Sequence, residues 1–130
     1  IPTVEAMACG VPNIICNYTT SYELVGADKP ECPEEMLLPH GADGDNNLIE
    51  SDRGFLVPYK DMMWDTPIRA APMRALWDEQ KAADALEHYY HNKDVLKEHG
   101  ENARKYALKH YDWTNAVGPM WEKWIRKIKL

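Results

Sequence analysis

Residues 1–17 read IPTVEAMACGVPNIICN and contain a helix pattern followed directly by a strand pattern. An Ala-Met-Ala run of strong helix formers follows Thr3, which can serve as the N-cap. Gly10 supplies a left-handed stop, and the proline two residues later prevents the helix from continuing. We therefore expect a helix over residues 3–9. The apolar run at 11–16 then predicts a strand covered on both faces, as in a parallel sheet.

The middle of the chain predicts two short elements and a long connection. A capping-box pattern at residues 20–23 predicts a brief helix that ends at Gly26. Residues 27–52 are rich in Pro, Gly, Asp and Asn, and we expect a long loop there, with a short extended piece at 36–38. The apolar run at 54–58 predicts a second strand that its proline ends.

The last part of the chain predicts a helical tail over residues 73–130. Its first helix is predicted from apolar residues at helical spacing, namely Leu76, Ala83, Leu86 and Tyr90. A second helix is expected over residues 95–111, and Asp112 can cap a third. The third helix would carry the apolar residues Val117, Met120, Trp121, Trp124, Ile125 and Ile128.

The predicted elements form one domain over residues 1–130, with an α/β portion at 1–60. Two strands are too few for a sheet that stands alone, so we expect further strands before Ile1. The apolar connection at 62–72 would pack on that additional part. The fold class is therefore α/β with few parallel strands, followed by the helical tail.

Composition excludes several classes of protein. The chain has 45% hydrophobic residues and a formal net charge of -6, which is typical of a folded globular protein. The negative charge argues against non-specific binding to nucleic acid or to an anionic membrane, since both require a basic surface. No apolar run approaches the roughly 18 residues of a membrane-spanning helix, and no signal peptide is recognisable.

Cysteines and histidines offer weak metal-site candidates. Cys9, Cys16 and Cys32 form no CxxC pair and are interpreted as reduced thiols of a cytoplasmic protein. Cys9 and Cys16 lie in apolar segments, so we expect them to be small hydrophobic residues of the core. His88 and His91 lie three residues apart on a predicted helix, where a surface position is favoured over zinc binding. The acidic residues of the long loop, Asp43, Asp45 and Glu50, lack the EF-hand pattern, so we expect a solvated loop and no metal.

Glu5 is the candidate binding residue. Pro2 suits the first position of a helix, where its missing N–H has no cost. The free N–H groups of Thr3 and Val4 would then favour an anion such as a diphosphate. A carboxylate one turn into the helix can accept hydrogen bonds from the hydroxyls of a ribose. An equally simple interpretation is that Glu5 only complements the helix dipole.

The stretch from Ile1 to Pro12 resembles the C-terminal signature of retaining glycosyltransferases with the GT-B fold, group 1 (family 4). Their pattern is Glu, seven residues, Glu, then Ala-Met-Ala-Cys-Gly-x-Pro. Four further matches follow in order along the chain: Tyr22-Glu23-Leu24-Val25, Arg53-Gly54-Phe55-Leu56-Val57-Pro58, the helix at 97–110, and Tyr111-Asp112-Trp113. The resemblance implies part of a Rossmann-like GT-B C-terminal domain.

The resemblance also implies a function. Glu5 matches the family's second Glu, which binds the ribose of a nucleotide-diphosphate sugar, and Thr3 and Val4 match backbone beside the diphosphate and sugar. The first Glu, the basic residues for the diphosphate and the acceptor domain would precede Ile1. The chain would then be the donor-binding fragment, inactive alone, of an enzyme that transfers a sugar with retention. The family needs no bound cofactor or metal.

Two other functions stay open. The chain could be a non-catalytic α/β interaction module that binds a partner, or self-associates, through its apolar N-terminal edge and its Trp-rich tail. It could also belong to another GT-B enzyme, such as a sugar-nucleotide epimerase or phosphorylase. We expect Trp121 and Trp124 of the last helix to be packing residues, and the resemblance implies that part of this stripe contacts the N-terminal domain. Peripheral membrane contact is the alternative, because the basic residues Lys123, Arg126, Lys127 and Lys129 lie close by.

Overall fold

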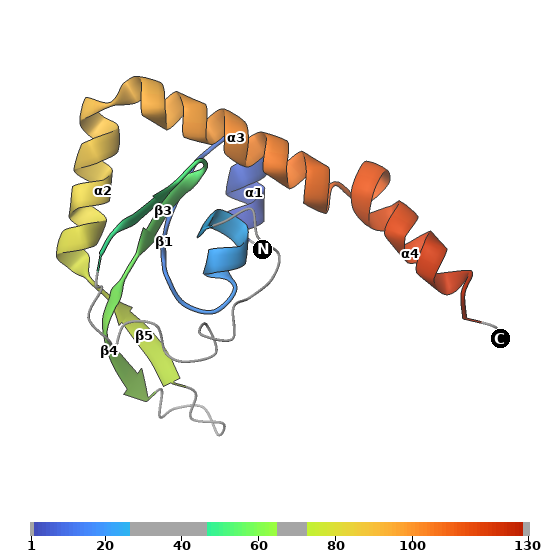
Figure 1. The fold of residues 1–130 in the computed structure, drawn as a ribbon, viewed down its shortest axis with the longest axis horizontal. Helices are drawn as coiled ribbons and strands as arrows, with labels where there is room; N and C mark the ends of the chain where they lie inside the picture. The colour runs from blue at the N-terminus through green and yellow to red at the C-terminus, as the bar shows by residue number, and fades with distance from the viewer. Residues whose placement is uncertain (1, 27–46, 65–72, 129–130) are drawn as a thin grey trace.

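The computed structural model describes residues 2–26, 47–64 and 73–128 and has a mixed α/β architecture (Figure 1). A three-stranded sheet lies beside two long helices, a two-stranded hairpin projects from it, and a last helix extends away from them. In chain order the elements are α1 (Pro2–Ala8), β1 (Asn13–Cys16), the π-helical turn η1 (Tyr22–Gly26), β2 (Ile49–Ser51), β3 (Gly54–Val57), β4 (Tyr59–Trp64), β5 (Met73–Trp77), α2 (Glu79–His91), α3 (Lys93–Tyr111), the π-helical turn η3 (Trp113–Val117) and α4 (Gly118–Ile125).

The first sheet has three strands in the order β1-β3-β2. β1 pairs in parallel with β3, with Ile14 opposite Phe55, as the two apolar runs predicted. Every residue of β3 is buried, because it is the central strand. The predicted loop over residues 27–52 is wrong at its end, where β2 pairs antiparallel with β3. Residues 27–46, including the extended piece at 36–38, lie outside the described residues.

Helix α3 packs against α1 and closes one side of the molecule (Figure 1). Met7 of α1 is fully buried against Ala103 and Ala107 of α3. Gly10 has a φ of 77°, which confirms the predicted left-handed stop after α1. The chain there lies so close to α3 that a Cβ on Gly100 would be 2.3 Å from the carbonyl oxygen of Gly10. Small residues thus allow the two helices to approach closely.

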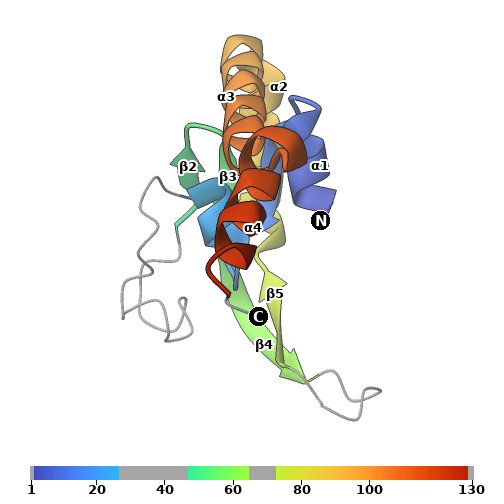
Figure 2. The same ribbon diagram turned by 90° about the vertical axis from the view of Figure 1, so that its right-hand side faces the viewer.

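Strands β4 and β5 form an antiparallel hairpin that the sequence patterns did not predict. Met62 lies opposite Ala75, so residues 62–64 are a strand rather than a connection, and the helical tail does not begin at residue 73. The helix begins only at Glu79, where the Asp78 side chain accepts a hydrogen bond from the Lys81 N–H at 3.0 Å. The hairpin projects from the rest of the chain (Figure 2).

The buried face of α2 does not carry the apolar residues from which the helix was predicted. Ala82, Ala85 and Tyr89 are buried, whereas Leu86 and Tyr90 are more than 60% exposed. The core of this region forms around Phe55 of β3, which packs against Ala85 and Tyr89. Apolar residues lie on both sides of α2, so helical spacing alone did not identify the side that meets β3.

The end of the chain follows the prediction for a capped helix. The Asp112 carboxylate accepts a hydrogen bond from the Asn115 N–H at 2.6 Å, and η3 leads directly into α4. None of the α4 residues is buried. Among the helices of residues 2–26, 47–64 and 73–128, none combines the length and the apolar character needed to cross a bilayer.

Candidate functional site

Helix α1 holds all three predicted binding residues on its first turn. The helix begins at Pro2, so Thr3 lies inside it and is not the N-cap that the sequence suggested. Thr3 and Val4 are half-buried, and the amide of Asn13 donates a hydrogen bond to the Thr3 carbonyl oxygen at 3.5 Å. The opposite end of the helix is fixed by the Arg104 guanidinium, which donates to the Ala8 carbonyl oxygen.

The Glu5 side chain is exposed on the first turn of α1. Among the described residues its carboxylate makes no hydrogen bond or ion pair. Two residues further on, Met7 faces α3 and is fully buried. The helix is therefore anchored through Met7, and Glu5 remains available to solvent and to a ligand.

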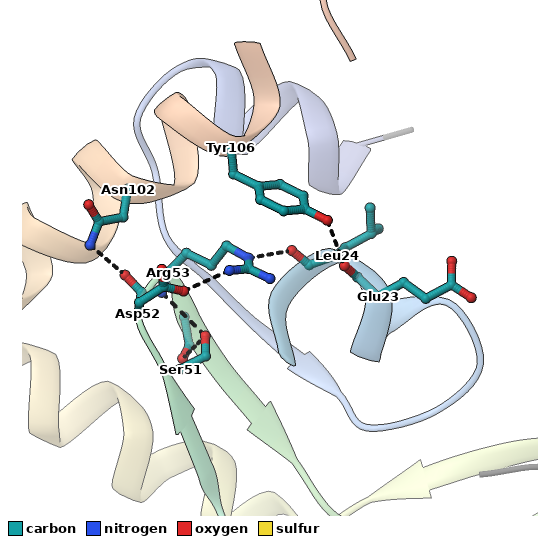
Figure 3. A network of polar contacts seen from close by, with 8 residues as sticks. Glu23, Leu24, Ser51, Asp52, Arg53, Asn102 and Tyr106 are labelled. Atoms are coloured by element: carbon teal, nitrogen blue, oxygen red, sulfur yellow. Dashed lines mark hydrogen bonds and ion pairs between the residues drawn. The ribbon is translucent and has the colours of Figure 1, made fainter. Parts of the chain in front are cut away.

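A buried arginine lies next to η1, the turn that follows β1 in the described chain (Figure 3). Arg53 is only 1% exposed, and its Nε donates a hydrogen bond to the Leu24 carbonyl oxygen at 2.9 Å. Its Nη1 donates to the Asp52 carboxylate at 2.7 Å. A buried guanidinium needs such partners, because its desolvation is costly.

Helix α3 completes this network. The Tyr106 ring lies 4.1 Å from the Arg53 guanidinium carbon, and the Tyr106 hydroxyl donates a hydrogen bond to the Glu23 carbonyl oxygen at 3.1 Å. The Asn102 amide donates to the Asp52 carbonyl oxygen at 3.0 Å. Together these contacts hold η1, the β2–β3 turn and α3 in one arrangement (Figure 3). The sequence offered no signal for it, since an arginine at a turn is usually solvated.

A second polar cluster joins β2, α2 and α3. The Tyr89 hydroxyl and His99 Nδ1 are 2.9 Å apart, and both side chains are buried. The Glu50 carboxylate lies 3.8 Å from His99 Nε2 and 3.7 Å from His88 Nε2. Within residues 2–26, 47–64 and 73–128 no group of three or more His, Cys, Asp or Glu could hold a metal ion. The cluster therefore connects structural elements and offers no metal centre.

His88 and His91 of the zinc candidate belong to no group of described residues that could hold a metal ion. His91 is exposed and lies 3.8 Å from Glu87 of its own helix, while His88 points to Glu50 instead. Asp43 and Asp45 of the calcium hypothesis lie outside the described residues.

The described cysteines are both free. Cys9 directly follows the last turn of α1 and is exposed, which corrects the expectation that it belongs to the core. Cys16 is half-buried, and burial raises the pKa of its thiol. Cys32 lies outside the described part of the chain.

The Tyr89 cluster predicts an alkaline effect on stability. Burial raises the pKa of the Tyr89 phenol, and the negative charge of Glu50 raises it further. Because the pKa is higher in the folded state, the unfolded chain loses this proton first as the pH rises. The stabilisation is thus complete below about pH 10 and is lost above it. We expect the unfolding free energy of Tyr89→Phe to fall less steeply with alkaline pH, as measured by urea unfolding. If the unfolding free energies of the parent and the variant fell equally steeply with rising pH, this prediction would be contradicted.

Comparisons of the chain with family models, with curated proteins and with solved structures gave no match. The features that bear on function are therefore local ones. They are the exposed Glu5 on α1, the Arg53 network around η1, and the order in which α1, β1 and β3 follow one another.

Proposed function

We propose that this chain is the donor-nucleotide-binding part of a retaining glycosyltransferase of the GT-B fold, group 1 (family 4). The enzyme would transfer a sugar from a nucleotide-diphosphate sugar to an acceptor. The motif resemblance at Glu5–Pro12 supports the proposal, together with the helix, glycine turn and parallel strand into which those residues fold. The observation that carries it is the Glu5 carboxylate, which is exposed and unpaired among the described residues on a helix anchored by Met7.

In this proposal Glu5 accepts hydrogen bonds from the ribose hydroxyls of the donor. The backbone of Thr3 and Val4 lies beside the diphosphate and the sugar. Catalysis in such an enzyme comes mostly from positioning the donor and from stabilising the charge that develops on the leaving diphosphate. The packing of α1 on α3 contributes rigidity, so that Glu5 is presented without a large ordering cost when the nucleotide binds. A cytoplasmic location fits the free thiols of Cys9 and Cys16.

Nucleotide binding to Glu5→Ala tests the proposal. The ribose would lose hydrogen bonds to a charged acceptor, each worth about 1.5–3 kcal/mol. We therefore expect the Kd of UDP or GDP, whichever the complete protein binds, to rise at least about tenfold in isothermal titration calorimetry. The melting temperature should stay unchanged, because the Glu5 side chain is exposed.

Glu101→Ala is the matched control, since Glu101 is another exposed helical carboxylate, on α3. Its Kd should equal that of the parent protein. Equal nucleotide affinity of Glu5→Ala and the parent would remove Glu5 from the site. Absence of any nucleotide binding by the complete protein would instead favour the non-catalytic interaction module.

A further inference from the structure

Helix α4 presents an apolar face that no described residue covers. Met120, Trp121, Trp124 and Ile125 are each more than half exposed. The Trp121 and Trp124 rings pack edge to face, with centroids 5.5 Å apart, and together with Met120 they line a shallow depression. The helix extends away from the sheets and from α2 (Figure 1). This surface therefore contributes nothing to the core of the described chain.

Basic residues flank the apolar face of α4 and continue past its end. At about 100° per residue, the four apolar residues fall within one arc of α4 and Lys123 falls outside it, while Arg126 is the C-cap and Lys127 follows the helix. Arg126 pairs with Glu122 at 3.6 Å, whereas in the described part of the chain Lys123 and Lys127 make no ion pair. Residues 118–128 carry three basic residues and one acidic residue, so this segment is locally positive although the chain as a whole has a formal charge of -6.

We propose that α4 binds in the plane of an anionic lipid membrane, with Trp121 and Trp124 inserted at the level of the headgroups. Tryptophan is enriched at this level because its ring is apolar and its N–H is polar. Lysine and arginine beside the apolar face are attracted to anionic headgroups. Because α4 projects from the body, the acidic remainder of the chain can stay in water (Figure 1).

Helix α4 alone offers little area to a protein partner. An eight-residue helix is only about 12 Å long. By itself it supplies only part of the roughly 800 Å² per partner that a stable protein interface buries. A lipid surface accepts the same helix without a complementary shape.

Vesicle sedimentation of the full chain tests the inference. We expect binding to vesicles of phosphatidylcholine with ~30% phosphatidylglycerol to exceed binding to phosphatidylcholine alone by at least about fivefold, and to fall in high salt. The double variant Trp121→Ala/Trp124→Ala should bind at least about tenfold more weakly. Trp64→Ala is the control, since Trp64 is equally exposed but lies on the β4–β5 hairpin, and it should bind like the parent.

A charge variant gives a second test that leaves the apolar face intact. Lys123→Gln/Lys127→Gln should abolish the preference for anionic vesicles, whereas Lys97→Gln/Lys105→Gln on α3 should retain it. Parent protein that does not sediment with anionic vesicles overturns the inference, as does undiminished sedimentation of the Trp variant. A dimer in light scattering that Trp121→Ala/Trp124→Ala dissociates also overturns it and identifies a second copy as the partner. The vesicle experiments contain no nucleotide, so their outcome does not decide the donor-site proposal.

Discussion

Replacement of Arg53 by alanine is expected to lower the free energy of unfolding by about 3 kcal/mol. The variant loses the hydrogen bond to the Leu24 carbonyl oxygen and the contact with the Tyr106 ring, and it leaves a cavity at a side chain that is 1% exposed. Urea unfolding followed by circular dichroism measures the change. The loss is large because Arg53 links η1 to both the β2–β3 turn and α3 (Figure 3).

Two further arginine variants test whether the buried contacts of Arg53 cause this loss of stability. Arg53→Lys keeps the charge but not the planar arrangement of donors, so it should lose part of the stability. Arg126→Ala removes an arginine that is 81% exposed and pairs only with Glu122 among the described residues, so it should change stability by less than about 0.5 kcal/mol. An Arg53→Ala variant as stable as Arg126→Ala would show that the buried network contributes little.

The substitution Gly100→Ala should lower the free energy of unfolding, although helix propensity alone predicts that it would raise it. Within a helix, alanine is more favourable than glycine by about 1 kcal/mol. At Gly100, however, the added Cβ would lie 2.3 Å from the Gly10 carbonyl oxygen, which belongs to the backbone and cannot rotate away. Helices α1 and α3 would have to separate, at the expense of the packing around Met7. We expect unfolding to become easier by about 2–3 kcal/mol in urea titrations.

The neighbouring exposed position supplies the control. Glu101→Ala and Glu101→Gly differ by the same methyl group on the solvent side of α3, so the alanine variant should be the more stable by about 1 kcal/mol. A stabilised Gly100→Ala protein would mean that α1 and α3 lie farther apart than the structure shows. Because Glu5 lies on α1, the same variant should also weaken nucleotide binding under the proposed function.

Local patterns were enough to predict several elements of this chain. Alanine-rich helix formers, a glycine stop and a following proline predicted α1 and the turn at Gly10, and an apolar run predicted β3. The Asp112 cap and the long helix before it were also confirmed. These signals depend on residues within a few positions of one another, so they can be recognised without knowledge of the rest of the fold. The positions of Thr3, Val4 and Glu5 on one helical turn follow from the same local rules.

Other features depend on partners that are distant in the sequence. β5 is a strand because it pairs with β4, although its apolar spacing also fits a helix. Arg53 is buried because Leu24 and Tyr106, from either side along the chain, enclose it. The side of α2 that faces Phe55 was likewise selected by packing rather than by periodicity. Strand pairing and burial depend on contacts between residues that are distant in the sequence. Short-range patterns therefore do not determine them.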